Sequence, residues 1–201
     1  MKYLGSKQLE TDRLVLKAQQ MDEQKRLWEI LMIPEVNRYF LTVPIKFRDK
    51  LNDWSRQEKY YEKEMKSSHD NNVFKWSIFL KEPGECIGRI SCHEAFLENP
   101  NINDPNIRGV GWIIDPKYQG MGYGTEAAKA MIDFMFSECK ISKIITGAAI
   151  CNPASWKIME KLGFERQKQT KMIQYTFLDE LIEIYCYELT SEKYLSFHKN
   201  C

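Results

Sequence analysis

The sequence predicts a single α/β domain of the α+β kind, in which a mixed, mostly antiparallel sheet of about seven strands is flanked by about four to five helices. Two observations predict this class. Residues 74–94 contain two apolar stretches joined by a Pro-Gly turn, which is the pattern of an antiparallel hairpin. Residues 109–150 contain a strand, an amphipathic helix and another apolar strand, which is the pattern of a parallel βαβ unit.

Composition limits the class of protein. The chain has 201 residues, 43% hydrophobic and 12% aromatic, so we expect residues 1–201 to form one domain with one core. Lys and Arg number 29 against 28 Asp and Glu, and a formal charge of +1 leaves no large basic surface for nucleic acid. The apolar stretches are too short to span a bilayer, and the N-terminus lacks the apolar run of a signal peptide. We therefore expect a cytoplasmic protein with neither nucleic acid nor membrane as partner.

The six cysteines are scattered, without a CxxC pair and without a histidine at metal-ligand spacing. They are Cys86, Cys92, Cys139, Cys151, Cys186 and Cys201. The adjacent residues Cys92 and His93 do not form a nucleophile–base dyad, because neighbours on a strand point to opposite faces. We expect reduced, mostly buried thiols and no metal site.

The first third of the chain predicts one strand and two helices. Residues 13–17 alternate in the manner of an edge or half-buried strand. Residues 21–32 carry apolar side chains at helical spacing, namely Leu27, Ile30 and Leu31. Two prolines then interrupt the chain. Residues 51–67 place aromatic and apolar side chains on one side and predict a second helix, with Trp54, Tyr61 and Met65 on that side.

The middle of the chain predicts the hairpin and a binding loop. Strands are expected at residues 74–80 and 86–94, on either side of the turn at 82–85. Residues 96–106 form a long loop of the kind usually kept for binding, because turn residues crowd it: Asn99, Pro100, Asn101, Asn103, Asp104 and Pro105.

The C-terminal half predicts the remaining elements. In chain order they are a strand at 109–114, a helix at 125–140, a strand at 144–150, a helix at 153–162 closed by Gly163, and strands at 165–174 and 183–189. The βαβ unit makes its two strands parallel. It also places the N-terminus of its helix beside the carboxyl end of its first strand.

Residues 115–127 connect that strand to that helix and carry Gly120, Gly122 and Gly124. Glycine lets the backbone approach a ligand closely, and the unpaired donors at the start of the following helix favour an anion, so the loop predicts a pyrophosphate site. A P-loop needs a lysine after its last glycine, and a dinucleotide fingerprint needs a glycine at position 125. Thr125 excludes both. The alternative is a tight turn that binds nothing.

Two stretches resemble the signatures of the GNAT superfamily of N-acetyltransferases. Residues 119–124, Gln-Gly-Met-Gly-Tyr-Gly, follow Gly-Trp-Ile-Ile-Asp-Pro and are similar to its acyl-CoA loop, Q/R-x-x-G-x-G/A. Residues 152–164 are similar to its second signature, an asparagine, a short helix and a terminal Leu-Gly-Phe. Residues 9–16 resemble the opening of the branch that includes the ribosomal-protein N-terminal (alanine/serine) acetyltransferases. The resemblance covers a core at about residues 9–189, followed by a short extension at 190–201.

The resemblance implies where the co-substrate acetyl-CoA binds. In this superfamily the parallel strand pair splays apart, and the pantetheine arm lies in the gap, bonded to strand backbone. Carried over, Ile113 and Ile114 hold the arm, and no metal takes part. Asn152 lies beside the arm, although its place before Pro153 is also explained by helix capping. The pyrophosphate is then held by Gln119, Gly120, Met121, Gly122, Tyr123, Gly124 and Thr125.

Transfer to an amine passes through a tetrahedral oxyanion and needs an oxyanion donor, a base and an acid for the leaving thiolate. The backbone amide near Ile114 is our candidate donor, with a purely structural Ile114 as an equal alternative. Many relatives use a tyrosine where this chain has Met159. The resembling branch suggests Ser155 as the acid beside the cofactor, with water or an ordinary first-turn serine as alternatives. For the base we select Glu94, with His93 on the opposite face as the alternative.

The resemblance therefore implies an N-acetyltransferase that moves an acetyl group from acetyl-CoA to a primary amine by direct attack in a ternary complex. The alternative is a catalytically weak or inactive acyl-CoA-binding module that acts as a sensor or partner-binding subunit. We expect a small-molecule amine or a protein N-terminus as acceptor, and a monomer or homodimer. The acceptor side should use residues 31–61, the loop at 96–106 and the last strands, where acidic residues permit a cationic acceptor: Asp179, Glu180 and Glu183.

Overall fold

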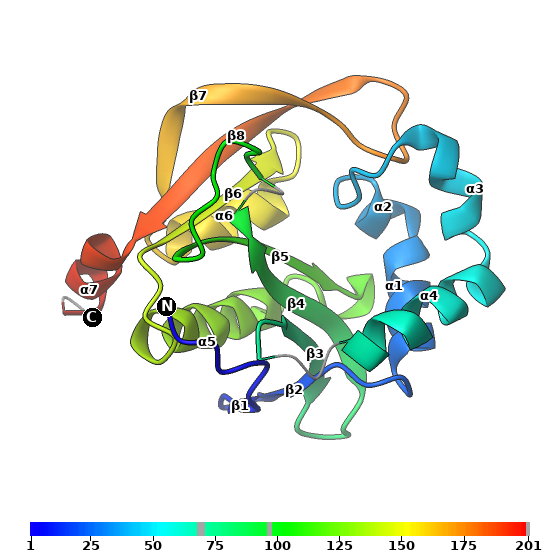
Figure 1. The fold of residues 1–201 in the computed structure, drawn as a ribbon, viewed down its shortest axis with the longest axis horizontal. Helices are drawn as coiled ribbons and strands as arrows, with labels where there is room; N and C mark the ends of the chain where they lie inside the picture. Colours follow the sequence, from blue (N-terminus) through cyan, green and yellow to red (C-terminus); the bar gives the residue numbers. More distant parts are fainter. Residues whose placement is uncertain (68–70, 96–97, 200–201) are drawn as a thin grey trace.

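The computed structural model describes residues 1–67, 71–95 and 98–199, which contain an eight-stranded sheet with helices on both faces (Figure 1). The strands lie in the order β1-β2-β3-β4-β5-β6-β8-β7, and each neighbouring pair is antiparallel except β5 and β6. Their bounds are Leu9–Glu10 (β1), Leu14–Ala18 (β2), Phe74–Leu80 (β3), Cys86–Glu94 (β4), Ile107–Ile114 (β5), Lys143–Ala149 (β6), Glu165–Gln174 (β7) and Leu181–Thr190 (β8). The predicted mixed, mostly antiparallel sheet is confirmed.

The helices form two layers around this sheet. Those within the described residues are α1 (Gln24–Met32), α2 (Pro34–Asn37), α3 (Arg48–Leu51), α4 (Trp54–Ser67), α5 (Tyr123–Ser137), α6 (Pro153–Lys161) and α7 (Ser191–Lys199). Ile113 and Ile114 point to opposite faces of β5, as neighbours on a strand do. Ile113 packs against Ile30 of α1, whereas Ile114 joins the main core with Met131 of α5. Helices α1 and α5 therefore cover opposite faces.

Helix α5 is fixed on the sheet by small and flexible apolar side chains. Ala127, Ala128, Met131 and Met135 are fully buried on its sheet-facing side. Alanine lets a helix approach a sheet closely, and methionine fills the irregular space between them. This packing holds the N-terminus of α5 beside the carboxyl end of β5, as the βαβ pattern predicts.

The parallel strands β5 and β6 separate after three paired residues. Their pairing ends at Gly109 and Ile145, although β5 continues to Ile114 and β6 to Ala149. Just beyond the last pair, the Thr146 hydroxyl donates to the Val110 carbonyl at 3.1 Å. Beyond this closed end, β6 pairs only with β8, and β5 pairs only with β4. The predicted splayed pair is therefore present.

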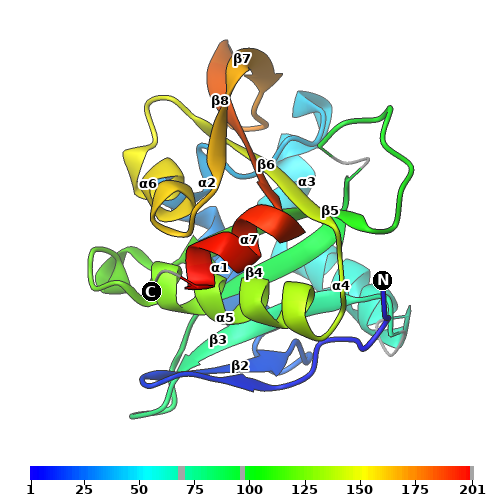
Figure 2. The same cartoon turned by 90° about the vertical axis from the view of Figure 1, so that its left-hand side faces the viewer.

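The predicted elements are all found, with ends shifted by up to three residues. Strand β1 adds an eighth strand, because a two-residue strand leaves no alternating pattern in a sequence. The extension at 190–201 contains α7, which lies beside α5 (Figure 2). Its Tyr194 stacks on Phe136 of α5 with ring centroids 4.7 Å apart. Phe96 and Leu97 of the predicted loop lie outside the described residues. Among the described helices, none has the length and apolar character needed to cross a bilayer.

Candidate active site

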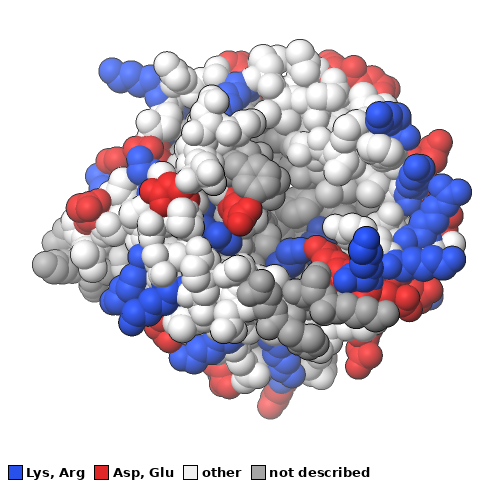
Figure 3. All heavy atoms as spheres, viewed as in Figure 1, with Lys and Arg blue, Asp and Glu red and all other residues white. Residues whose placement is uncertain are grey.

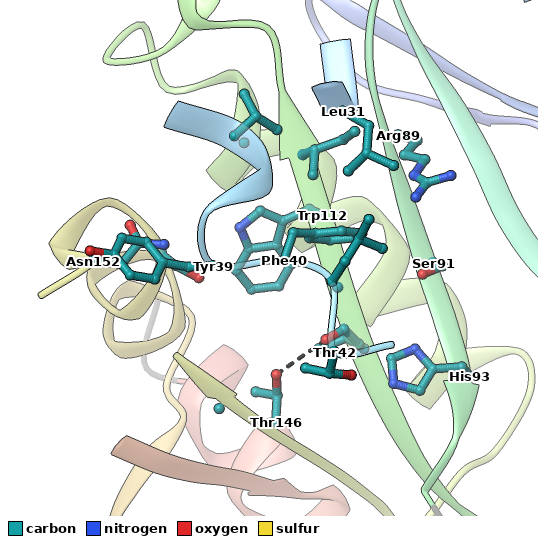
Figure 4. A pocket seen from close by; sticks show the side chains of 18 of the residues that line it. Leu31, Tyr39, Phe40, Thr42, Arg89, Ser91, His93, Trp112, Thr146 and Asn152 are labelled. Carbon is teal, nitrogen blue, oxygen red and sulfur yellow. Dashed lines mark hydrogen bonds between the residues drawn. The ribbon is translucent and has the colours of Figure 1, made fainter. Parts of the chain in front are cut away.

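A cavity of about 1430 Å³ lies beside the gap between β5 and β6. It is lined by β4 and β5, by segments of α1, α2 and α4, by the start of α6, and by β7 and β8. The molecule is hollowed on the face shown in Figure 3, and Figure 4 shows the side chains on these walls. The cavity reaches the glycine loop at one end and the aromatic segment around α2 at the other. One continuous space thus joins the glycine loop, where the cofactor is expected, to residues 31–61, where the acceptor is expected.

The glycine loop has the geometry of an anion site. Gly120 and Gly122 adopt φ values of +76° and +86°, which favour glycine because a Cβ is strained there. Gly122 is the N-cap of α5 and has no side chain to cap it, so the first backbone donors of this 15-residue helix are left for a ligand. The Gln119 side chain turns inward and donates to the Ile114 carbonyl at 2.8 Å. It anchors the loop to the end of β5 rather than extending toward a phosphate.

A cation stands next to this loop. Arg13, in the turn of the first hairpin, which β1 and β2 form, lies with its guanidinium 4.4 Å from the centre of the Tyr123 ring and donates to the Met121 carbonyl at 3.0 Å. Its Nη2 is 2.6 Å from Glu126, in the first turn of α5. The hairpin and the loop are therefore tied together by one hydrogen-bonded ion pair.

The edge of β5 that faces the gap carries backbone donors. Asp115 N–H donates to the Ile87 carbonyl of β4 at 2.8 Å. Backbone groups alternate sides along a strand, so the N–H of Ile114 points away from β4 and toward the gap. Its side chain is 7% exposed and packs in the main core. The Ile114 side chain therefore has the core role foreseen for it, while its backbone N–H faces the gap, where an oxyanion role stays a prediction.

The start of α6 forms the other side of the gap. Asn152 is the N-cap of α6 but makes no side-chain capping bond, so capping does not account for this asparagine. Its side chain lines the cavity (Figure 4). Ser155, half-buried in the first turn, lines the cavity as well. Met159, one turn farther along α6, is apolar and only 2% exposed. Just before α6, the sulfhydryl of Cys151 donates to the Tyr39 hydroxyl at 3.2 Å.

Tyr39 is a cavity residue that the sequence pattern did not single out. Its pKa is raised from the ordinary value, first by the hydrogen bond with Cys151 and then by burial. The phenol lies edge-on to Tyr175 of the segment between β7 and β8, with ring centroids 5.8 Å apart. Tyr39 follows the short helix α2 and belongs to neither of the two sequence signatures, so only the folded structure brings it to the cavity.

Strand β4 presents one face to the cavity and the other to the core. Arg89, Ser91 and His93 line the cavity (Figure 4). Cys92 faces the core, where burial raises the pKa of its thiol to about 12. Glu94, on the same side as Cys92, is exposed and does not belong to the cavity wall. The structure therefore separates Glu94 from Ser155 and brings the alternative base, His93, to the cavity instead.

His93 has a partner that the sequence did not reveal. Its Nε2 lies 3.1 Å from Glu98 Oε1, in the long loop after β4. The three acidic residues expected near the acceptor, Asp179, Glu180 and Glu183, do not line the cavity, although Tyr175 and Ile184 in the same part of the β7–β8 hairpin do. Asp179 pairs with Arg48 at 2.9 Å, and Glu183 accepts from the Thr170 hydroxyl at 2.6 Å.

The remaining predictions about cysteine and metal concern the described residues alone. Cys86, Cys92 and Cys139 are buried free thiols, Cys186 is half-buried, and Cys151 is exposed. Burial raises the pKa of the Cys86 thiol to about 11. Over residues 1–67, 71–95 and 98–199, no group of three or more His, Cys, Asp or Glu side chains is arranged to hold a metal ion.

The family model described as an acetyltransferase (GNAT) domain matches residues 13–165, which include the splayed strands, the glycine loop and α6. The chain belongs to the GNAT acetyltransferase family. The resemblance seen in residues 119–124 and 152–164 is thereby confirmed for the superfamily.

Similar proteins agree with this membership. The chain is 30% identical over 97 residues to the uncharacterized N-acetyltransferase YnaD of Bacillus subtilis, an alignment that covers 48% of this chain and spans about half, 53%, of that relative. The ribosomal-protein-S5-alanine acetyltransferase of Vibrio fischeri has the same fold, with a TM-score of 0.68 and 17% identity over 94% of this chain and 99% of that one. A spermidine N-acetyltransferase of Vibrio cholerae, solved with CoA and spermine, gives a TM-score of 0.72 and 17% identity over 92% and 99%.

Proposed function

We propose that the protein transfers the acetyl group of acetyl-CoA to a primary amine by direct attack within a ternary complex. The observation that carries the proposal is the gap between β5 and β6, which leads to the glycine loop at its open end and borders the 1430 Å³ cavity along its side. A thioester in the gap and an amine in the cavity meet without a covalent enzyme intermediate. Family membership supports acetyl transfer, and the similar fold that holds CoA and spermine supports an amine acceptor.

The residues at this end of the cavity fit CoA. Residues 119–125 offer backbone amides and the uncapped end of α5 to a pyrophosphate. Ile114 offers a backbone N–H to the arm from one side, whereas the backbone groups of Ile113 point toward β4, although Ile113 lines the cavity. Asn152 offers an amide side chain without a capping role from the other side. Acetyl-CoA supplies the acetyl group as an activated thioester.

Ser155 is the residue we assign to the leaving thiolate. It lines the cavity from the first turn of α6, directly after the open end of β6. Met159 occupies the position of the tyrosine used by many relatives and has no proton to give. The oxyanion is assigned to a backbone N–H on the edge of β5 that faces the gap, in the row of alternating donors that begins at Ile114 and continues toward the closed end, because a fixed strand amide costs no reorganisation as charge develops.

The proposal is tested by measuring CoA release with a panel of primary amines that includes amino acids, peptides with free N-termini, polyamines and aminoglycosides. Direct attack predicts intersecting initial-velocity lines when acetyl-CoA and the accepted amine are varied together. Parallel lines would indicate an acetyl-enzyme and contradict the ternary complex. CoA binding without turnover on any amine would support the binding-module alternative instead.

A further inference from the structure

We propose that His93 and Glu98 act together as the base that takes the first proton from the acceptor amine. This assignment rests on the acetyl transfer proposed above. His93 Nε2 lies 3.1 Å from Glu98 Oε1, and the two side chains are only 24% and 30% exposed. A carboxylate at one ring nitrogen selects the tautomer with its proton there and leaves the other nitrogen, Nδ1, as the proton acceptor.

A glycine on the neighbouring strand makes room for this pair. His93 lies opposite Gly109 in the β4–β5 ladder. A Cβ built at Gly109 would stand 2.4 Å from His93 Nε2 and 2.9 Å from Glu98 Cγ, closer than carbon contacts allow. Any other residue at 109 would displace both side chains. The absence of a side chain at Gly109 therefore lets His93 and Glu98 pack against β5.

The pair stands at the end of the gap where catalysis needs a base. Gly109 is the last residue of β5 paired with β6, so His93 marks the closed end of the splay. Ile114 and the glycine loop mark its open end, about 17 Å farther along β5 at 3.3 Å per residue. A cofactor held by its pyrophosphate at the open end directs its thioester toward His93. The acceptor amine, which must meet that thioester, then lies within the same part of the cavity.

The proton balance follows from these positions. The acceptor ammonium gives one proton to His93 Nδ1, and the neutral amine attacks the thioester carbon. The carbon–nitrogen bond forms, the nitrogen loses its second proton to solvent, and the carbon–sulfur bond breaks. Ser155 protonates the thiolate and regains a proton from solvent, while His93 releases its own proton to solvent. One proton is released per turnover, as amide formation from an ammonium and a thioester requires.

Charged and titratable groups around the pair come from several elements. The Lys171 ammonium of β7 donates to the Glu98 carbonyl at 3.3 Å. Burial raises the pKa of Tyr175 to about 12, with the Glu98 charge as a second cause. Burial also raises the pKa of Cys186, where Lys171 acts in the opposite direction. Neither Tyr175 nor Cys186 therefore competes with the imidazole for a proton near neutral pH.

Glu94 supplies a matched control, because it is a carboxylate one residue from His93 on the opposite face of β4. His93→Gln should lower kcat/KM by about 10²- to 10⁴-fold. Glu98→Gln should lower kcat/KM by roughly tenfold, because the imidazole loses the carboxylate that fixes its tautomer and orientation. Glu94→Gln should stay within about twofold of the parent. Acetyl-CoA should bind all three variants with the parent Kd.

Turnover that survives His93→Gln within about twofold would overturn this assignment alone, whereas no turnover in the parent would overturn the proposed function. Histidine nitrogen NMR on the full chain provides a readout without turnover. The chain has three histidines, and the one lost in His93→Gln should be the Nε2–H tautomer and should shift in Glu98→Gln. An Nδ1–H tautomer at His93, or no response to Glu98→Gln, would refute the pair.

A different observation identifies the acceptor's chemistry, again within the proposed function. We infer that the amine also carries a carboxylate, which Arg89 binds. Arg89 lines the cavity from β4 with its guanidinium 5.4 Å from the centre of the Phe40 ring. Among the described residues it forms no ion pair. A guanidinium held by stacking on a cavity wall presents its N–H groups for bidentate recognition of a carboxylate.

The acidic side chains of the cavity do not offer the opposite recognition. Glu64 pairs with Lys75, Glu98 with His93, and Glu188 with Lys143. The remaining lining carboxylate, Glu35, is exposed on α2. A second cationic group on the acceptor would thus meet three carboxylates that already form ion pairs and one exposed carboxylate at Glu35, whereas a carboxylate would meet a guanidinium that forms no ion pair within the described residues.

Free amino acids and their carboxamides test this inference, because each pair differs only in the anion. The parent should use the acid with a KM at least about tenfold below that of the amide, and Arg89→Met should remove this difference by raising KM for the acid more than it lowers kcat. Arg48→Met, outside the cavity on α3, should keep the preference. Equal use of acid and amide by the parent, or a polyamine preferred to every amino acid, would overturn the assignment of Arg89 without touching the proposed acetyl transfer.

Discussion

Glu126→Gln should both destabilise the protein and weaken CoA binding, because Glu126 ties the first hairpin to the glycine loop. Its carboxylate accepts from the Thr11 hydroxyl at 2.5 Å, the Arg13 N–H at 3.0 Å and Arg13 Nε at 2.7 Å. The same guanidinium donates to the Met121 carbonyl. Loss of the negative charge therefore releases Arg13 and, through it, the backbone on which the pyrophosphate is expected to lie.

The size of the effect follows from burial. The Glu126 side chain is 18% exposed, whereas Arg13 is 47% exposed, so water screens one partner and not the other. A charge-assisted hydrogen bond contributes about 1.5–3 kcal/mol when buried, and an exposed ion pair at most about 1. Gln keeps one acceptor oxygen. We therefore expect the free energy of unfolding to fall by about 1–2 kcal/mol at pH 7, which lowers Tm by about 2–8 °C for a chain of this size.

The loss of stability in Glu126→Gln should depend on pH. Burial raises the pKa of Glu126, but hydrogen bonds from Thr11 and Arg13 outweigh it and leave the pKa below the ordinary value of 4.5. A depressed carboxyl pKa stabilises the fold fully above the unfolded value and loses that contribution as pH falls through the folded value. The difference between parent and Glu126→Gln should therefore be full at pH 7 and shrink below about pH 4.5.

Urea unfolding at pH 7 and pH 4, with CoA calorimetry at pH 7, measures both effects. Glu138→Gln is the matched control, since Glu138 pairs with Lys7 but is 44% exposed. It should change the unfolding free energy by less than about 0.5 kcal/mol. If Glu126→Gln matches this control at pH 7 and binds CoA as the parent does, the link between hairpin and loop has no energetic role.

Three further predictions concern α6, its C-terminus and the thiols. Ser155→Ala should lower kcat by about 10²- to 10⁴-fold and leave the acetyl-CoA Kd nearly unchanged, since the hydroxyl acts as the thiolate departs. Gly163→Ala should lower the unfolding free energy by about 1–2 kcal/mol in urea titrations, because φ is +83° and a Cβ would lie 2.9 Å from the Phe197 ring. Iodoacetamide at pH 8 should modify exposed Cys151 long before Cys92, whose pKa burial raises to about 12, as peptide mass spectrometry would show.

Each of these has a control within the chain. Ser155→Thr keeps the hydroxyl and should keep most of the rate, so equal losses in both serine variants would remove the acid role from Ser155. Gly84→Ala tests strain alone, because φ is +86° with no atom within 4 Å of a Cβ, and it should cost less than Gly163→Ala. Saturating CoA should slow the labelling of Cys151, which lies next to Asn152. Labelling of Cys92 at the same rate would contradict its burial.

The sequence was informative where local pattern and position coincide. Gly120 and Gly122 predicted a loop before a helix, because two left-handed backbone positions and an uncapped helix start are set by the residues themselves. The hairpin and the βαβ unit followed from periodicity in the same way. Helix α7 escaped prediction because its contacts, such as Tyr194 on Phe136, depend on where α5 lies in space.

The chemistry of the site was harder to predict. Alternation along β4 showed that Glu94 and His93 face opposite ways, but not which face borders a cavity, since both faces of the sheet are covered by helices. Glu98 lies in a loop whose path no periodicity describes, and Tyr39 reaches Cys151 only through the fold of α2. Contacts between single side chains that lie in different elements leave no pattern in one sequence.

Calorimetric titration of Gly122→Val with CoA tests the placement of the cofactor most directly. Valine adds bulk at the N-cap of α5, where φ is +86° and a Cβ would already lie 3.3 Å from Arg13. Gly84→Val is the matched control, with the same φ at a turn residue that does not line the cavity. A pyrophosphate site at the start of α5 predicts at least about tenfold weaker CoA binding in Gly122→Val and a parental Kd in Gly84→Val, with both variants folded. Parental CoA affinity in folded Gly122→Val would contradict the pyrophosphate site at the start of α5.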